Sequence, residues 1–401
     1  MNNKNASAIL IITFSGGYFL MAPFSELNLQ GQPVAPLAII ATPGADDFAK
    51  LIDKRLVEMF KGTDHAPQDG KDSYIIETLY PRFTSGDGKA LITETVRGKD
   101  LYIITDVGNH GVTYDLFGQK VPMTPDEHYA DLKRVICACT CKPARITVIM
   151  PMLYGGRQHR RNARESLDCA MMLQELHGLG INDIITFDAH DPRVCNAVPY
   201  MGFDNYFPHY QVLKLMKKNF PDVKLEKNSF MCISPDEGAL ARNIYYASVL
   251  GVDLGMFYKR RDYTQVVNGR NPIIAHEYLG APVMGMNVFV ADDIIATGDS
   301  IIKLAKEIKE KGANKVFLTA TFAIFSEGVE KFNKAYEEGI FDAVFSTNLT
   351  YTPPELEGCK WYYKADMSKY TSIIIAASNF NESVSNLIDP SAKINALLGR
   401  I

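Results

Sequence analysis

The sequence predicts an α/β protein with two domains, each a largely parallel β-sheet flanked by helices. The chain has 401 residues, which is long for one hydrophobic core and typical of two domains. Short β-branched runs bounded by turn residues alternate with amphipathic stretches along the chain. Buried strands of parallel sheets are continuous apolar runs of this kind, and their alternation with helices is typical of α/β layers.

The individual elements follow from these patterns. Apolar residues recur at helical spacing from Ser166 to His177 and from Lys303 to Lys311, so helices are expected there. The expected buried strands are residues 101–104, 146–150, 183–187, 230–233, 288–291, 315–319 and 372–376.

The boundary between the domains is placed near Phe207 to Tyr210. The first domain then spans 36–207 after an N-terminal extension over 1–35, and the second spans 208–379. Residues 380–401 are expected to pack back on the first domain. Ligands of open parallel sheets bind beyond the carboxyl ends of the strands, so functional residues are sought there.

The charge and the apolar segments of the sequence bear on which partners and which compartment are expected. The formal net charge is −4, so no global basic field favours nucleic acid or an anionic membrane as a partner. The apolar stretch from Ala8 to Ala22 has some features of a signal peptide, but residues 15–17 interrupt it with Ser-Gly-Gly. A short strand or hairpin at the start of a cytoplasmic protein is the preferred interpretation.

The seven cysteines show no spacing typical of a disulfide framework, which favours a reducing compartment. Cys137, Cys139 and Cys141 look like a possible metal site. They alternate within an expected helix, where Cys137 and Cys141 share a face that Cys139 does not. No second pair follows at a zinc spacing, so buried or half-buried free thiols are expected.

The strongest functional signal lies at residues 288–301, where an apolar strand runs into Asp292 and Asp293 and then into the loop from Thr297 to Ser300. Backbone N–H groups at the start of the following helix suit a phosphate. The two carboxylates suit the 2- and 3-hydroxyls of a ribose, or a magnesium ion. An acidic helix cap is the simpler alternative, but a cap does not need two carboxylates and this loop.

This segment resembles the phosphoribosyl-diphosphate motif shared by type I phosphoribosyltransferases and ribose-phosphate pyrophosphokinases. Other segments resemble signatures of the pyrophosphokinases alone, in the same order along residues 38–388. They are residues 83–87 with 94–100, 151–160, 188–191 with 203–205, 234–238, 258–261 and 382–385.

The resemblance implies two domains of type I phosphoribosyltransferase-like architecture. It implies an enzyme that uses magnesium to transfer diphosphate from ATP to the 1-hydroxyl of ribose 5-phosphate, giving phosphoribosyl diphosphate and AMP. It also implies a homo-oligomer, from dimer to hexamer, in which subunits share ATP contacts. The run 262–269 would be a mobile lid that excludes water.

The resemblance also assigns roles to individual residues. The moving phosphates need neutralising cations, and a solvated surface run is the alternative for these basic residues. Phe83 would stack on adenine, with core packing as its alternative. The implied roles are catalysis for Lys259 and Arg261; ATP binding for Phe83, Ser85, Asp87, Arg157 and Gln158; ribose 5-phosphate binding for Asp292, Asp293, Ala296, Thr297, Gly298, Asp299 and Ser300; and metal binding for His190 and Asp236.

Several positions depart from the family pattern. Ser85 replaces an Asp, His159 replaces an Asp, and Ala296 stands where the pyrophosphokinases usually have Asp. Asp299 adds a negative charge to the loop expected to hold the 5-phosphate. Three alternatives therefore remain: a non-catalytic regulatory subunit associated with an active pyrophosphokinase, a phosphoribosyltransferase, and an unrelated α/β binding module.

Overall fold

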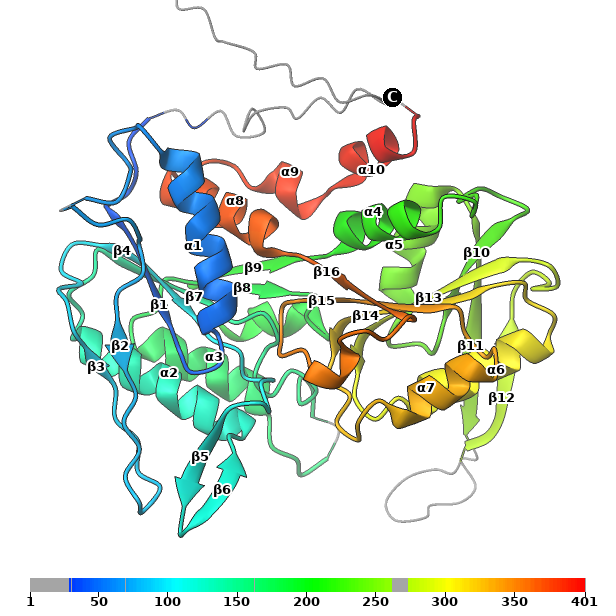
Figure 1. Cartoon of the computed structure of the whole chain (residues 1–401), viewed down its shortest axis with the longest axis horizontal. Helices are drawn as coiled ribbons and strands as arrows, with labels where there is room; N and C mark the ends of the chain where they lie inside the picture. The colour runs from blue at the N-terminus through cyan, green and yellow to red at the C-terminus, as the bar shows by residue number, and fades with distance from the viewer. Residues whose placement is uncertain (1–28, 30, 69, 162, 262–272, 401) are drawn as a thin grey trace, which may run out of the picture.

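The computed structural model describes residues 29, 31–68, 70–161, 163–261 and 273–400, and the side chains of all of these except 259–261 and 273–276. Within that part, two large sheets, one parallel and one largely parallel, lie side by side (Figure 1). No helix in these ranges is long and apolar enough to cross a membrane.

The first sheet has five parallel strands in the order β1-β4-β7-β8-β9. Alternate residues of β4 enter opposite cores, since Leu101 and Ile103 pack with α2 and α3 whereas Tyr102 and Ile104 pack toward α1. The elements are β1 (Leu37–Ala41), α1 (Asp46–Phe60), β4 (Asp100–Ile104), α2 (Pro125–Cys139), β7 (Arg145–Ile149), α3 (Asp168–Gly178), β8 (Asp183–Phe187), the 3-10 helix η1 (Pro192–Ala197) and β9 (Gly202–Tyr206).

We call the part of the molecule built on this sheet the first half, and the part built on the seven-stranded sheet the second half. Two small hairpins project from the first half. Thr124 and Glu127 form a capping box that starts α2 directly after the second hairpin. The hairpins are β2 (Thr78–Leu79) with β3 (Leu91–Ile92), and β5 (Thr113–Leu116) with β6 (Gln119–Pro122).

The second sheet has seven strands in the order β12-β11-β10-β13-β14-β15-β16, and only the β11–β12 pair is antiparallel among these described strands. The chain leaves β10 toward β11 and later returns to β13 on its other side, which creates a topological switch point between β10 and β13. The elements are α4 (His209–Asn219), β10 (Phe230–Ser234), α5 (Leu240–Leu250), β11 (Asp253–Arg261), β12 (Ile273–Leu279), β13 (Asn287–Ile295), α6 (Asp299–Glu310), β14 (Val316–Ala323), α7 (Glu330–Glu337), β15 (Ala343–Thr347), η2 (Pro354–Leu356) and β16 (Tyr362–Ala365).

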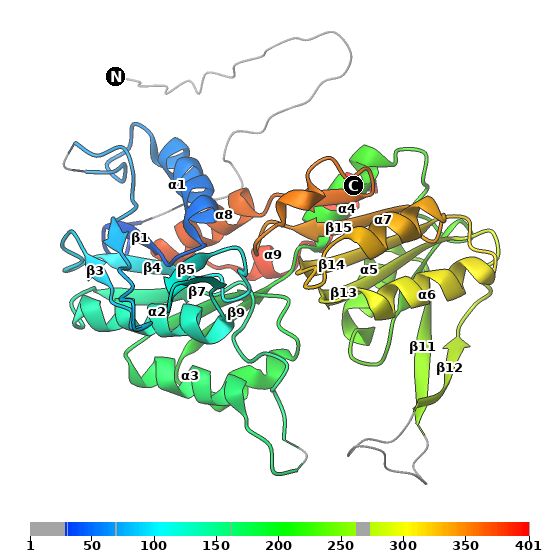
Figure 2. The same cartoon turned by 60° about the horizontal axis from the view of Figure 1, so that its bottom comes forward.

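After β16 the chain crosses back to the first half. Helix α8 (Ser368–Asn379) packs against α1, and the two lie side by side in both ribbon views (Figures 1 and 2). The strand expected at 372–376 is therefore wrong, because that apolar run is the interior of α8, and all five of its residues are buried. A short apolar run cannot by itself distinguish a buried strand from a buried helix.

The last helices are α9 (Ser385–Ile388) and α10 (Ser391–Leu397), and they pack against different halves of the molecule. Phe380 and Leu387 join the core of the first half, but Ile394 of α10 packs with α4 and α5 of the second half. The expected return of 380–401 to the first domain is thus wrong for α10. The proposed boundary at Phe207 to Tyr210 falls between β9 and α4.

The cysteine expectation needs two corrections. Helix α2 ends at Cys139, and Cys141 follows with φ of +53°, so Cys137 and Cys141 do not share a helical face. Both of these thiols are exposed rather than buried. Cys139 is buried, and burial raises its pKa to about 12. All seven are free thiols, as expected.

Candidate functional site

A cavity of about 340 Å³ lies between the two halves of the molecule. It is located at the carboxyl ends of β7, β8 and β13. The first half contributes Arg157, Gln158 and His190 to its lining, and the second half contributes Asp293 and Ala296. The structure thus brings together five residues that the sequence singled out from separate segments.

His190 and Asp293 meet across this cavity. His190 follows β8, Asp293 lies in β13, and His190 Nδ1 is 2.6 Å from Asp293 Oδ2. The hydrogen bond to Asp293 raises the pKa of His190 above its ordinary value. Burial alone would raise the pKa of Asp293, but the His190 hydrogen bond and the Arg242 charge hold it well below its usual range. The pair therefore links the two halves through a short hydrogen bond.

A buried guanidinium lies behind this pair. Arg242 of α5 approaches Asp188 with Nη2 at 2.9 Å from Oδ1 and approaches Asp292 with Nη1 at 3.5 Å from Oδ1. Thr321 Oγ1 also donates to Asp188 at 2.6 Å. Burial raises the pKa of Asp188, while the Arg242 charge opposes that rise.

The two neighbouring carboxylates have different environments. Strand β13 was expected to end before Asp292 but runs on to Ile295, because Ile294 and Ile295 continue the pairing with β14. The side chains of Asp292 and Asp293 nevertheless lie close enough to interact with each other and with Arg242. Burial and the charge of Asp293 raise the pKa of Asp292 well above its ordinary value.

The loop after β13 leads into α6 through Gly298, whose φ of +88° lies in the left-handed region. A Cβ added there would lie 2.3 Å from the Phe332 ring. Only glycine fits this position, which directs the first turn of α6 toward the end of β13. The amide groups at this helix start can bind an anion.

Asp299 begins α6 and is paired rather than isolated. Lys331 of α7 approaches it with Nζ 2.7 Å from Oδ1, and the same ammonium lies 2.6 Å from Glu327 Oε2. The ammonium group of Lys331 thus lies beside the negative charge that Asp299 adds to the loop. Nothing in the sequence motif indicated Lys331, which is 32 positions further along the chain.

Arg157 and Gln158 lie in the loop after β7, where Gln158 N donates to Gly155 O at 2.7 Å. The next residue, His159, lies with Nδ1 3.0 Å from Asp191 Oδ2, and its ring centroid is 5.3 Å from that of His190. Burial lowers the pKa of His159. This departure from the family pattern therefore lies next to His190.

Three of the expected ATP residues lie elsewhere on this chain. Phe83, Ser85 and Asp87 occupy an exposed turn in which Phe83 N donates to Asp87 O and Ser85 Oγ donates to Asp87 Oδ2. The Phe83 side chain is 55% exposed, so its alternative role in core packing is wrong. None of the three is among the described residues that line the cavity.

Asp236 follows β10 and accepts hydrogen bonds from the amides of Gly238 and Ala239 at 3.0 and 3.2 Å. It too is not among the described lining residues of the cavity. Lys259 and Arg261 lie in β11, but their side chains are outside the described residues, as is the expected lid 262–269.

The fit of a magnesium ion rests on His190. Its Nδ1 is occupied by the Asp293 carboxylate while the side chain lines the cavity, which leaves Nε2 for a ligand. Metal-binding histidines usually have this second partner. Among the described residues, no group of three or more His, Cys, Asp and Glu side chains could hold a metal. Magnesium commonly takes its remaining ligands from substrate phosphates and water, so the arrangement fits such an ion.

The sequence motifs had not indicated Arg242 as a site residue. It lies six positions after Asp236, in a helix that the motifs did not describe. A signal was available, because a charged residue on the buried face of an amphipathic helix needs a buried partner.

Comparisons with known proteins find two domains of one enzyme family in this chain. Residues 37–180 match the family model for the N-terminal domain of ribose phosphate pyrophosphokinase, and residues 204–342 match that for the phosphoribosyl transferase domain. A ribose-phosphate pyrophosphokinase of Vibrio cholerae is 27% identical over 313 residues, covering 77% of this chain and 90% of that protein. One of Ralstonia nicotianae is 29% identical over 256 residues, covering 63% and 72%.

The crystal structure of phosphoribosylpyrophosphate synthetase from Mycobacterium smegmatis is similar in fold. Its TM-score is 0.69 at 19% sequence identity, covering 86% of this chain and 99% of that one. The expected α/β fold with phosphoribosyltransferase-like architecture is confirmed.

Proposed function

The chain belongs to the ribose-phosphate pyrophosphokinase family of enzymes, and from that premise we propose that it transfers diphosphate from ATP to the 1-hydroxyl of ribose 5-phosphate. The products are phosphoribosyl diphosphate and AMP. The observation that carries this proposal is the cavity in which His190 and Asp293 meet, since residues from both halves converge there at strand ends.

Ribose 5-phosphate would occupy the β13 side of the site. Asp292 and Asp293 would accept hydrogen bonds from the ribose hydroxyls. The 5-phosphate would bind the loop of Ala296, Thr297, Gly298, Asp299 and Ser300, where the amides of the helix start favour an anion. Because Lys331 is paired with Asp299, the negative charge of this loop is partly offset.

ATP would occupy the side lined by Arg157 and Gln158. Phe83, Ser85 and Asp87 are assigned to ATP as well, although their turn is exposed on this chain. These residues would complete the site of a neighbouring copy. The active form would then be a homo-oligomer, from dimer to hexamer.

Phosphoryl transfer depends on alignment and charge neutralisation more than on covalent chemistry. Lys259 and Arg261 would neutralise the moving phosphates. His190 and Asp236 would hold magnesium, which when bound neutralises phosphate charge. The Asp293 carboxylate holds the ring of His190 in its orientation. Arg242 holds the carboxylates of Asp188 and Asp292 in place.

The test is an assay with ATP, magnesium and ribose 5-phosphate that follows AMP and phosphoribosyl diphosphate, with the sugar phosphate omitted as a control. Steady AMP production that depends on the sugar would support the proposal. Binding of ATP without turnover would contradict it and favour the regulatory subunit.

A matched pair of variants tests the catalytic assignment. Lys259→Ala should abolish turnover without unfolding the protein, whereas Lys224→Ala, at an exposed lysine of the same half, should not. Wild-type rates in Lys259→Ala would rule out the assigned role.

A further inference from the structure

Two histidines of the first half lie next to each other beside the cavity. His159 lies in the loop after β7 and His190 follows β8, and these two strands are parallel neighbours in the first sheet. His190 lines the cavity, as do Arg157 and Gln158, the two residues that precede His159. The ring centroids of the two histidines are 5.3 Å apart, with 60° between the ring planes. Both side chains therefore start from the edge of the sheet at which ligands bind.

Each of the two rings has a carboxylate at its Nδ1 atom. Asp293 Oδ2 lies 2.6 Å from His190 Nδ1. Asp191 Oδ2 lies 3.0 Å from His159 Nδ1. Asp191 is itself held in place, because it accepts a hydrogen bond from Arg193 N at 3.0 Å where η1 begins. Metal-binding histidines commonly have a carboxylate at the nitrogen that does not bind the ion, so both rings have this support.

The opposite nitrogen, Nε2, is open on both rings. No residue in the described part of the chain forms a hydrogen bond with the Nε2 atom of His159 or His190. Neither atom belongs to the enclosed side-chain atoms that lack a partner among the described residues, so both can be reached from solvent. Burial lowers the pKa of His159 and thereby favours its neutral ring, which is the form that binds a metal.

The spacing of the rings allows one ion to bind both. Bonds of about 2.1 Å from a metal to two nitrogens place those nitrogens about 3 Å apart. Rings whose centroids are 5.3 Å apart reach that separation when their Nε2 edges face each other. No third His, Cys, Asp or Glu of the described ranges completes a metal-binding group with them, so the other ligands must be phosphate oxygens and water.

We propose that His159 is a second nitrogen ligand beside His190, and that the site of this chain therefore holds a divalent transition metal in preference to magnesium. Imidazole nitrogens favour first-row transition metals, whereas magnesium prefers oxygen. The family pattern has Asp at the position of His159, so this chain offers a nitrogen where an oxygen is usual. The proposal rests on the proposed metal-binding role of His190 and does not require turnover.

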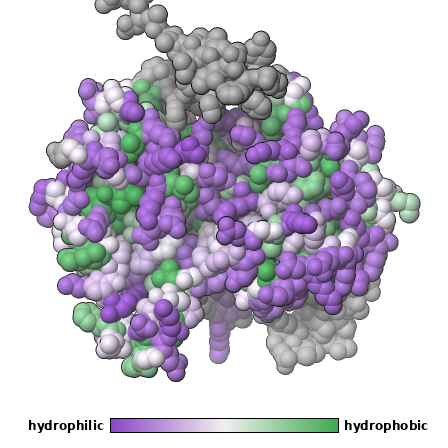
Figure 3. Space-filling model, in the orientation of Figure 1, coloured by the Kyte–Doolittle hydropathy of each residue, from purple (hydrophilic) through white to green (hydrophobic). Residues whose placement is uncertain are grey.

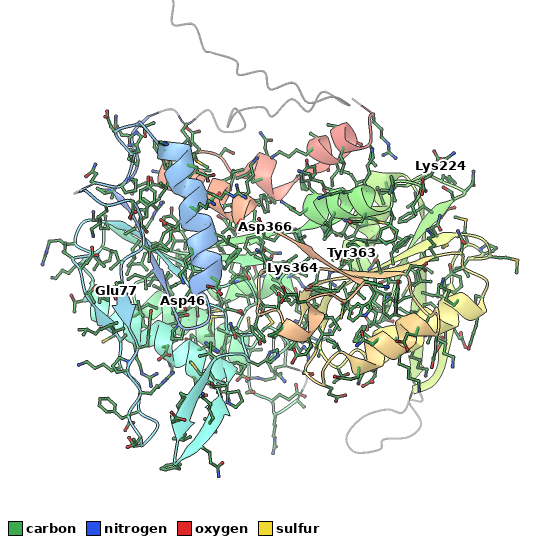
Figure 4. All side chains as sticks on the ribbon, in the orientation of Figure 1. Asp46, Glu77, Lys224, Tyr363, Lys364 and Asp366 are labelled. Atoms are coloured by element: carbon green, nitrogen blue, oxygen red, sulfur yellow. The ribbon has the colours of Figure 1, made fainter. Side chains whose placement is uncertain are left out.

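Mn²⁺ is a suitable probe because its ligands can be told apart by element. Figure 3 shows mainly hydrophilic residues on the face drawn, and Figure 4 labels Asp46, Glu77 and Asp366 at three separate segments of the chain. Carboxylates of this kind offer only oxygen to an ion bound elsewhere on the surface. The exposed thiols of Cys137 and Cys141 are soft ligands, which suit manganese poorly. A nitrogen coordinated to Mn²⁺ therefore indicates histidine.

The test is pulsed electron paramagnetic resonance of Mn²⁺ bound to the full chain, which counts the coordinated nitrogens. The hydrogen bond to Asp293 raises the pKa of His190, so the measurement is made at about pH 8 to favour its neutral ring. The wild type should show two coordinated nitrogens, and His159→Gln should show one. In competition titrations the wild type should bind Mn²⁺ at least about tenfold more tightly than Mg²⁺, and His159→Gln should lose most of that preference.

Two further variants control for folding and for other histidines. His159→Asp restores the oxygen of the family pattern, so it should still bind Mn²⁺, with one nitrogen and a weaker preference over Mg²⁺. His177→Gln, at an exposed histidine in the last turn of α3, is the matched control and should retain both nitrogens.

The outcomes separate this proposal from the proposed function. A single nitrogen in the wild type, removed by His190→Gln alone, would overturn the role of His159 and leave that of His190 standing. Two nitrogens that persist in His159→Gln would also overturn it, because the ion would then be bound elsewhere. No coordinated nitrogen at all would overturn the metal-binding role of both histidines, whether or not the protein turns over its substrates.

Discussion

Arg242 Nη2 lies 2.9 Å from Asp188 Oδ1, so a guanidinium of the second half neutralises a carboxylate of the first. The side chain of Arg242 is 8% exposed and that of Asp188 is 4% exposed. Breaking a buried pair by removing one partner leaves an uncompensated charge, which is strongly destabilising.

Arg242→Met should therefore lower the free energy of unfolding by about 3–5 kcal/mol, measured by urea denaturation. Lys50→Met is the matched control, because Lys50 pairs with Asp47 at 3.6 Å while both side chains are exposed, by 70% and 99%. That control should change stability little. Equal effects of the two variants would show that Arg242 does not act through its buried partners.

Gly298→Ala should weaken ribose 5-phosphate binding by at least about tenfold, because the added Cβ would overlap the Phe332 ring and displace either the ring or the loop. Gly339→Ala shares a positive φ of +71° but has no atom within 4 Å of the new Cβ. It should lower stability by about 1 kcal/mol without changing affinity. Titration calorimetry with the sugar phosphate distinguishes them, and unchanged affinity in Gly298→Ala would contradict the phosphate-loop assignment.

Asp299→Gly should tighten binding of ribose 5-phosphate, and Lys331→Met should weaken it, each on the order of a few-fold because the pair is exposed. Lys334→Met, at a 78% exposed lysine of the same helix, serves as the control. Affinity measured at low and high salt should show the differences shrinking as salt rises. If Lys331→Met binds as the wild type does, then Lys331 does not offset the charge of Asp299.

The burial of Asp106 predicts that the free energy of unfolding depends on pH. Burial raises its pKa from 3.8 to about 7, although Gly108 N, Thr350 Oγ1 and Tyr351 N donate to its carboxylate and oppose the rise. The folded state then binds more protons than the unfolded state between these values. The free energy of unfolding should therefore fall as pH increases from about 4 to about 7.

Asp106→Asn should flatten this slope in urea denaturation series run at several pH values. Asp222→Asn, at an exposed carboxylate, should leave the slope unchanged. A slope that persists in Asp106→Asn would assign the effect to other groups.

Much of the fold followed from local sequence. The strands at 101–104 and 183–187 were expected within one residue of β4 and β8, because β-branched runs between turn residues have few alternatives. The run 372–376 was misread because both faces of α8 are covered, by α1 and by the sheet, so its apolar residues show no helical period.

The site was predictable where motifs cover it. His190 and Asp293 were both singled out, but their contact joins residues 103 apart in sequence, and no local pattern encodes it. Lys331 was missed for the same reason, since its role depends on where α7 lies relative to α6. The exposed position of Phe83 depends on how its turn lies on the folded chain, which its neighbours in sequence do not encode.

The crossover from β16 into α8 also affects the order in which the protein can form. Ile373, Ile374 and Ile375 of α8 complete the core that includes Ile39 of the first strand. During synthesis, the first half must therefore wait for almost the whole chain before its last helix is available. Until then the apolar face beside α1 has no cover, so the nascent first half depends on the completed second half for its own closure.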